Sequence, residues 1–362
     1  MMNFDDLLNT GPYSLEYDRK NEILSSELFH LTEFHYSKSP YYKNFLDSIN
    51  FDLKKMKIVS DLPFLPVRLF KDLELLSVPN ENIIKTMTSS GTTGQKVSKI
   101  FLDKETSSRQ TKVLTSIVAD FIGKKRLPML IIDSPDILNN RAMFSARGAG
   151  ILGFSIFGFE KEYALDNEMK IDFIRIENFL EKNKGKEIFI FGFTFMIWQH
   201  FYKELIKNKV KINLDSATLI HGGGWKKIQS ESVDNARFKE LLNQVCNIKP
   251  ENIHDYYGMV EQTGSIYMEC ESGYLHASNY SDILIRRPID FSIADYGEEG
   301  LIEVVSILPK SYPGHVLLTE DLGIIFGQDD CKCGRFGKYF KVSGRISNAE
   351  IRGCSDSYAT KF

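Results

Sequence analysis

The strongest constraint on the fold is an alternation of apolar and amphipathic segments between residues 86 and 258. Short apolar runs predict buried strands at residues 128–133, 151–157, 187–192 and 217–222. Segments with helical spacing of apolar residues predict helices at residues 105–121, 169–182, 195–206 and 230–246. Strands that alternate with helices are typical of a parallel sheet with helices on both faces. The sequence therefore predicts an α/β fold.

The regions on either side of this alternation have a different character. Residues 15–49 have apolar side chains at helical spacing, and two prolines interrupt the chain after them. After residue 264 the sequence predicts a smaller, mostly antiparallel region, with turn signals between short strands at residues 282–286, 301–307, 315–319 and 323–326. We therefore predict an N-terminal helical region, an α/β nucleotide-binding core, a smaller β-rich region and a C-terminal tail, with the bounds 1–85, 86–264, 265–345 and 346–362.

Charge and composition exclude several classes of protein. The chain has 45 Lys and Arg against 48 Asp and Glu, a net charge of −3, and this balance argues against a general nucleic-acid binder. The N-terminus is acidic where a secretory signal would be basic, and the longest apolar stretch, residues 188–198, is shorter than the ~20 residues that a membrane span needs. We expect a cytoplasmic protein without transmembrane segments, in which the five cysteines bind metal, react or pack.

A run rich in Ser, Thr and Gly is the clearest candidate for a phosphate-binding loop. It consists of Thr88, Ser89, Ser90, Gly91, Thr92, Thr93, Gly94, Gln95 and Lys96. The glycines let the backbone curl tightly, and five hydroxyls together with backbone N–H groups can surround a polyphosphate. Lys96 or Lys99 would supply counter-charge. The Gly-Lys-Ser/Thr ending of a P-loop is absent.

Three cysteines and one histidine in the C-terminal third form a candidate metal site. They are Cys270, His276, Cys331 and Cys333. Three thiolates and one imidazole suit a closed tetrahedral Zn²⁺ site, which would be structural because no coordination position stays open. The Cys-x-Cys spacing is tighter than the usual Cys-x-x-Cys, so the alternative of three buried cysteines and an unrelated histidine stays open.

Five segments stand in order along the chain at residues 88–96, 221–226, 257–261, 319–323 and 344–345. They resemble motifs of the adenylate-forming enzymes, the acyl-CoA synthetase and luciferase superfamily. The resemblance implies that the Ser/Thr/Gly run binds the phosphates of ATP and that the glycine-rich turn contacts adenine. It also implies that Tyr257 packs near adenine, Glu261 holds Mg²⁺ and Asp321 binds both ribose hydroxyls. The remaining motif residues are Gly222, Gly223 and Gly224 of the turn, Gly258 of the Tyr-Gly-x-x-Glu motif, and Gly344 and Arg345 at the hinge.

Within that superfamily the chain most resembles the acyl-protein synthetase family, the fatty-acid-activating component of the bacterial luminescence fatty acid reductase. The resemblance rests on the chain length, the Gly-Gly-Gly-Trp-Lys turn, the N-terminal helical segment followed by residues 63–71, and a Gly-Cys-Ser tail. It implies that Cys354 accepts the acyl group as a thioester and passes it to a reductase. The Cys/His quartet instead resembles the phenylacetate–CoA ligase branch.

The sequence departs from the superfamily after the hinge. Only 17 residues follow Arg345, so the C-terminal lid domain with its catalytic lysine is expected to be absent or reduced to a tail. Lys226 and Lys227 are candidates to neutralise the α-phosphate instead. We expect ATP-dependent activation of a carboxylic acid, with acyl transfer to Cys354 and on to a reductase or transferase. The alternatives are a ligase that uses coenzyme A and a non-catalytic nucleotide-binding partner protein.

Overall fold

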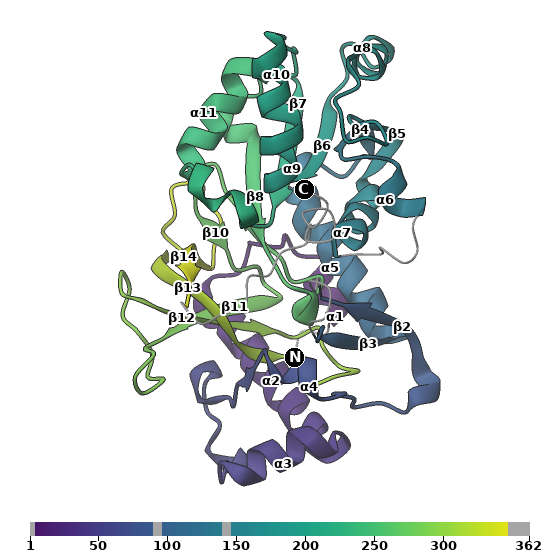
Figure 1. Ribbon diagram of the computed structural model, residues 1–362. Coiled ribbons are helices and arrows are strands. Elements are labelled where there is room, and N and C mark those ends of the chain that lie inside the picture. The colour runs from purple at the N-terminus through teal and green to yellow at the C-terminus, as the bar shows by residue number, and fades with distance from the viewer. Residues whose placement is uncertain (1–3, 90–95, 140–145, 347–362) are drawn as a thin grey trace.

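The structure is a computed structural model that describes residues 4–89, 96–139 and 146–346 (Figure 1). Its centre is a sheet of 12 strands, in which the order β11-β12-β13-β14-β10-β9-β8-β7-β6-β4-β5 is continuous and β1 pairs with β13 from the side. A separate two-stranded hairpin lies beside this sheet. The predicted α/β fold class is confirmed.

One half of the sheet is parallel. Its strands are β4 (Leu127–Ile132), β5 (Gly158–Tyr163), β6 (Ile188–Phe193), β7 (Ala217–Gly222) and β8 (Ile253–Tyr257). Helices connect these strands: α7 (Ala146–Phe154), α8 (Phe173–Lys182), α9 (Thr194–Met196), a π-helical turn (Ile197–Tyr202), α10 (Lys203–Asn208) and α11 (Asn235–Cys246). Strands β4 and β6 are buried along almost their whole length, as expected for a parallel sheet covered on both faces.

The other half of the sheet is antiparallel. It contains β9 (Tyr267–Glu269), β10 (Leu275–His276), β11 (Ser281–Arg286), β12 (Glu299–Ser306), β13 (Val316–Gln328) and β14 (Lys338–Arg345). Strand direction changes between β8 and β9. The sheet itself continues across this point, so the predicted division of the chain into four regions stays a prediction.

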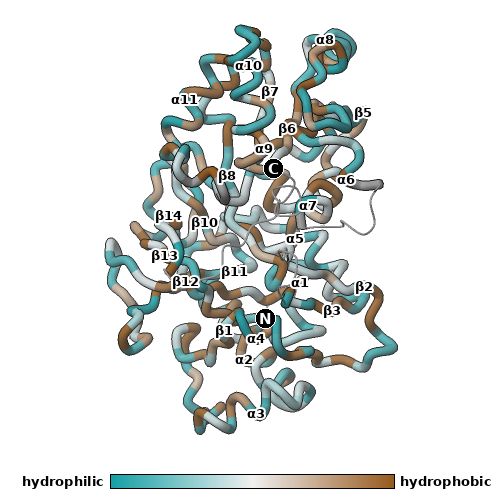
Figure 2. Tube along the Cα trace, viewed as in Figure 1, coloured by the Kyte–Doolittle hydropathy of each residue, from teal (hydrophilic) through white to brown (hydrophobic). Residues whose placement is uncertain are grey.

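The N-terminal segment packs against the antiparallel half. It contains α1 (Phe4–Leu8), α2 (Tyr17–Lys38), α3 (Pro40–Ser48), β1 (Leu65–Pro66) and α4 (Leu69–Asp72). After it come the hairpin β2 (Ile83–Thr88) and β3 (Lys99–Asp103), and then α5 (Lys104–Ile122). The hydropathy colours along the chain in Figure 2 show brown, apolar segments in the interior strands and teal segments at the outer ends of α10 and α11.

The prediction of a strand at residues 151–157 is wrong. This segment forms the end of α7 and a short 3₁₀ turn (Ser155–Phe157). Ile151 and Phe154 are buried, whereas Leu152 and Ile156 are exposed, so the burial follows helical spacing although nearly every residue is apolar. A short apolar run does not by itself distinguish a buried strand from a buried helix.

Other predicted helices and strands have different bounds in the structure. The predicted helix at residues 169–182 begins at Phe173, because the Asp172 side chain accepts the N–H of Arg175 and caps the helix there. The two short strands predicted at residues 315–319 and 323–326 are parts of the single strand β13. Within the described residues, no helix combines the length and apolar composition that a membrane span requires.

Candidate active site and metal centre

The predicted ribose-binding residue Asp321 lies at the centre of a polar cluster. Tyr257, at the end of β8, donates its hydroxyl to Asp321 Oδ2 at 2.8 Å. Arg345, at the end of β14, donates Nε to Asp321 Oδ1 at 2.6 Å. The two strands β13 and β14 place Asp321 and Arg345 as register partners. The structure therefore brings together three residues that are far apart in the sequence, and burial beside the Asp321 carboxylate raises the pKa of Tyr257.

Glu261 lies close by in the chain, on a single 3₁₀ turn (Val260–Gln262) that follows β8. Its side chain is buried. The next residue, Gln262, donates its amide to the backbone carbonyls of Val304 and Gly314 at 3.1 and 2.9 Å. These bonds join the turn to the antiparallel half of the sheet, so the position of the Glu261 backbone is determined by the surrounding fold.

The glycine-rich turn begins where β7 ends. A Cβ at Gly222 would lie 2.4 Å from the ring of Tyr256, so only glycine lets β7 and β8 approach this closely. Gly223 has φ +79, a left-handed conformation that glycine adopts without strain. Lys226 begins the next 3₁₀ segment (Lys226–Glu231), and its side chain is outside the part of the molecule that the structure describes.

The predicted phosphate loop connects β2 to β3. Ser89 and Ser98 close the hairpin below the loop, because the Ser89 N–H donates to the Ser98 carbonyl at 3.1 Å and Ser89 Oγ accepts the Ser98 N–H at 2.9 Å. Lys96 pairs with Asp72 at 2.9 Å on the surface, a contact that contributes little free energy. Residues 90–95, which carry most of the predicted phosphate contacts, lie outside the described residues.

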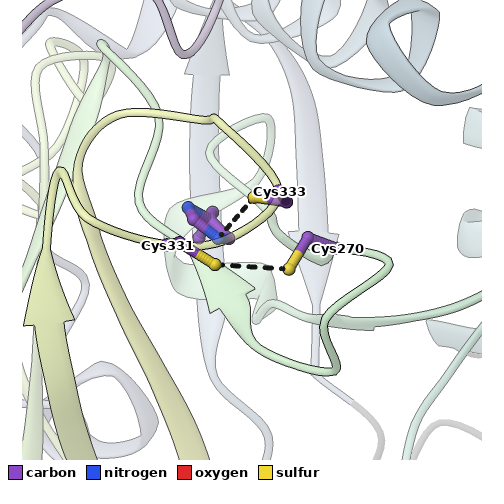
Figure 3. Close-up of side chains that lie close together, drawn as sticks. Cys270, Cys331 and Cys333 are labelled. Carbon is purple, nitrogen blue, oxygen red and sulfur yellow. Dashed lines mark hydrogen bonds between the residues drawn. The ribbon is translucent and has the colours of Figure 1, made fainter.

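The predicted metal ligands Cys270, His276, Cys331 and Cys333 come together. Their ligand atoms all lie within 4.8 Å of one another. The sulfurs of Cys270 and Cys331 are 3.9 Å apart, and Cys333 Sγ is 3.4 Å from His276 Nε2. In Figure 3, Cys331 and Cys333 project from one loop, and the Cys331 sulfur points toward Cys270, which projects from a separate segment of the chain.

The geometry and chemistry of this quartet fit Zn²⁺. Tetrahedral Zn–S bonds of about 2.3 Å place two sulfurs about 3.8 Å apart, close to the separation of Cys270 and Cys331. The Cys270 thiol and the neighbouring His276 lower the pKa of Cys333, whereas the pKa of Cys270 is raised by sharing its proton with Cys333. A thiolate is the form of cysteine that binds metal.

Sequence reasoning gave no role to Arg335, although it lies only two residues after Cys333. Its guanidinium donates to Glu271 and to Asp120 of α5 at 2.6 and 2.8 Å, and it lies 4.3 Å from the centre of the Phe121 ring. The backbone N–H of Phe336 donates to the Tyr13 carbonyl at 3.0 Å. The candidate metal centre therefore lies where α5, the N-terminal segment and the antiparallel strands meet.

The remaining predicted site residue is Cys354. It lies outside the described residues, as does the rest of the chain after residue 346. Gly258 follows Tyr257 directly and continues the same segment toward Glu261.

The arrangement of the sheet and helices is the fold of the adenylate-forming ligases, enzymes that use ATP to activate an acid. Two solved structures of 2-hydroxyisobutyryl-CoA ligase resemble the chain in fold. An open conformation in complex with 2-HIB-AMP and CoA has a TM-score of 0.70 and 14% identity, and covers 93% of this chain and 77% of its own. A postadenylation state in complex with R3-HIB-AMP has a TM-score of 0.69 at 14% identity, with 92% and 69% covered.

The sequence matches the profile of the family "Acyl-protein synthetase, LuxE" over residues 2–362, and the chain belongs to this family. Two relatives carry the name long-chain-fatty-acid–luciferin-component ligase. The protein of Aliivibrio fischeri is 28% identical over 335 residues, which cover 89% of this chain and 84% of the relative. The protein of Vibrio harveyi is 24% identical over 370 residues, with 99% and 93% covered.

Proposed function

We propose that this ligase activates a fatty acid with ATP, transfers the acyl group to Cys354 and then passes it to a partner protein. The observation that carries the proposal is the convergence of Tyr257, Asp321 and Arg345 from three separate strands. A carboxylate with two oxygens directed into one cluster is suited to the paired hydroxyls of a ribose. The names of the two relatives support a long-chain fatty acid as the substrate.

In the first half-reaction a carboxylate oxygen of the acid attacks the α-phosphorus of ATP. The bond to the bridging oxygen breaks, pyrophosphate leaves, and an acyl-adenylate forms. The loop from Thr88 to Gly94 binds the phosphates, Asp321 orients the ribose and Glu261 binds the Mg²⁺ that accompanies ATP. That Mg²⁺ would offset negative charge on the phosphate oxygens, and Lys226 would neutralise the α-phosphate.

In the second half-reaction the sulfur of Cys354 attacks the acyl carbon, and AMP leaves with the electron pair of the broken C–O bond. The thiol proton is released to solvent as the thiolate forms. Thiolate reacts well with activated acyl groups even when only a small fraction is ionised near neutral pH. A second thiol exchange would then move the acyl group to a reductase or transferase. Coenzyme A is the alternative acceptor, since one of the two solved ligases of similar fold is in complex with it.

The Cys/His quartet is proposed as a structural Zn²⁺ site. Four protein ligands would fill the coordination shell and leave no position for substrate. The quartet lies beside Arg335 and Tyr13, so the metal would join the N-terminal segment to the antiparallel strands. This structural role would be separate from the acyl chemistry.

The proposal is tested by pyrophosphate exchange and acyl labelling on the same preparation. Wild-type protein should exchange pyrophosphate into ATP only with a carboxylic acid present, and should keep a hydroxylamine-labile acyl label after denaturation. Cys354→Ser should keep the exchange and lose the label, because adenylation does not involve the thiol.

Cys246→Ala is the matched control. Cys246 is fully buried, and burial raises the pKa of its thiol to about 12, so it should not accept acyl groups. The control should therefore label like the wild type. Equal labelling of wild type and Cys354→Ser would place the acyl group elsewhere, and acylation of coenzyme A without a protein label would favour the alternative ligase. Absence of exchange with every acid would contradict the whole proposal.

A further inference from the structure

The loop between β12 and β13 joins the Glu261 turn to the helix that follows the phosphate hairpin. The Ser311 N–H donates to Thr106 Oγ1 at 3.1 Å, in the first turn of α5. Ser311 Oγ donates to the carbonyl of Phe101 in β3 at 2.7 Å. These two bonds attach the loop to the strand and helix that carry the far end of the phosphate hairpin.

Tyr312, the next residue, contacts Glu261 itself. Its side chain is fully buried, and its hydroxyl donates to the backbone carbonyl of Glu261 at 3.0 Å. The same hydroxyl accepts from the side-chain amide of Gln110, in α5, at 3.4 Å. Burial and the negative charge of Glu261 both raise the pKa of Tyr312, so its hydroxyl stays protonated and able to donate.

Two glycines allow this close packing. A Cβ at Gly314 would lie 2.3 Å from the Tyr312 ring and 3.0 Å from the Glu261 carbonyl. Gly264 has φ +91, and a Cβ there would lie 2.7 Å from the backbone of Gln110. The chain after Glu261 therefore rests directly on α5, at the same residue that contacts the Tyr312 hydroxyl.

We propose that Tyr312 is a positioning residue that sets the place of Glu261 relative to the phosphate loop, with Gln110 as its partner on α5. The inference rests on the proposed function, in which Glu261 binds the Mg²⁺ that accompanies ATP. A carboxylate and a set of phosphate oxygens bind one cation only if their separation is well defined. Since α5 follows the phosphate hairpin, the Tyr312 hydroxyl links the Glu261 turn directly to α5 and helps to maintain this separation. Small displacements of groups that act together can cost about 100-fold in rate.

Calorimetric titration with ATP, in the presence of Mg²⁺ and in the presence of EDTA, tests the inference. The ratio of the two affinities reports the contribution of the cation and is insensitive to a general loss of stability. Tyr312→Phe should lower this ratio about tenfold, as expected for loss of one buried hydrogen bond. Gln110→Met should lower it in the same direction.

Tyr280→Phe is the matched control. Tyr280 is also fully buried and contacts α5 through Ser116 at 3.3 Å, but its hydroxyl donates to Leu7 rather than to the Glu261 turn. It should keep the wild-type ratio. A wild-type ratio in both Tyr312→Phe and Gln110→Met, or an equal loss in Tyr280→Phe, would overturn the inference.

The same titrations separate this inference from the proposed function. Wild-type protein that binds ATP with a strong Mg²⁺ dependence but activates no acid would contradict the proposed reaction, and the variant ratios would still decide the role of Tyr312. Wild-type protein whose ATP affinity is the same with Mg²⁺ and with EDTA would overturn the inference directly.

Discussion

At the scale of single residues, Asp321 offers the sharpest test of the nucleotide site. If its carboxylate binds the ribose hydroxyls, Asp321→Asn should weaken ATP binding about 10–100-fold, the range expected for hydrogen bonds to a charged group. The hydrogen bonds from Tyr257 and Arg345 hold both carboxylate oxygens in place, so the loss should arise from charge and geometry at this one side chain.

The control for this experiment is an ATP analogue that lacks both ribose hydroxyls. Wild-type protein should bind 2′,3′-dideoxy-ATP as weakly as Asp321→Asn binds ATP, and combining the variant with that ligand should add little further loss. Fully additive losses would mean that Asp321 and the ribose hydroxyls act independently, which contradicts the assignment.

The types of residue in the candidate metal centre predicted it more clearly than the spacing of its cysteines did. Three cysteines and a histidine implied a metal centre from donor chemistry alone, and the fold brings their ligand atoms together. The roles of Arg335 and Tyr312 could not be predicted, because each depends on contacts across the fold. Arg335 reaches Asp120 of α5, 215 residues earlier in the sequence, and Tyr312 reaches Gln110, 202 residues earlier.

At the scale of secondary structure, the alternation of strands and helices was predictable. Along most of the core, the spacing of apolar residues in the sequence matches the spacing of buried residues in the structure. The prediction failed at residues 151–157, where apolar residues on both faces conceal the helical spacing of burial. Strand β5 was missed for the opposite reason: it is an edge strand in which the successive residues Glu160 and Lys161 are both exposed. Neither segment has the alternation of apolar and polar residues that predicts a half-buried strand.

The metal centre should control the order of the N-terminal segment. Lys20 is buried and donates to the Ala277 carbonyl at 3.1 Å, next to the proposed ligand His276. Purified protein should hold about one Zn²⁺ per chain, matching one closed site. Chelation or Cys331→Ser should then lower the melting temperature by at least about 5 °C, because metal binding is coupled to folding, and should expose Lys20 to trypsin.

The control for this experiment is Cys246→Ala, which removes a buried thiol from outside the quartet and should keep the zinc. Cleavage after Lys20 in the metal-free protein, identified by mass spectrometry, would confirm the release of the segment. Protein that contains no metal, or that resists trypsin equally with and without it, would show that the hydrogen bonds around Tyr13 and Lys20 suffice without a cation.

At the scale of the whole molecule, buried histidines join the N-terminal helices to the sheet. His35 of α2 stacks on His315, with ring centres 4.8 Å apart, and its Nδ1 and Nε2 lie 2.7 and 3.2 Å from Ser77 Oγ and the Pro309 carbonyl. Burial lowers the pKa of His35 to about 3 and the pKa of His254 to about 4, and it also lowers the pKa of His315. These residues are therefore neutral in the folded protein near neutral pH.

This burial makes folding stability depend on pH. An unfolded histidine takes up a proton near pH 6.5, whereas His35 in the folded protein does so only near pH 3, so the unfolded state binds more protons between these values. The stabilisation is present above pH 6.5 and is lost as pH falls. Each such histidine contributes a loss of up to about 1.4 kcal/mol per pH unit. Asp133, whose pKa burial raises to about 6, acts in the opposite direction between about pH 4 and 6.

We therefore expect His35→Gln, which cannot titrate, to reduce the difference in unfolding free energy between pH 7 and pH 5 by about 1–2 kcal/mol. Urea unfolding at the two pH values measures this difference, and comparison with the wild type cancels the contribution of Asp133. The variant itself should be less stable at pH 7, because a buried hydrogen bond at Ser77 or Pro309 is altered. An unchanged pH dependence would mean that the packing of α2 on the sheet opens enough for His35 to protonate in the folded state.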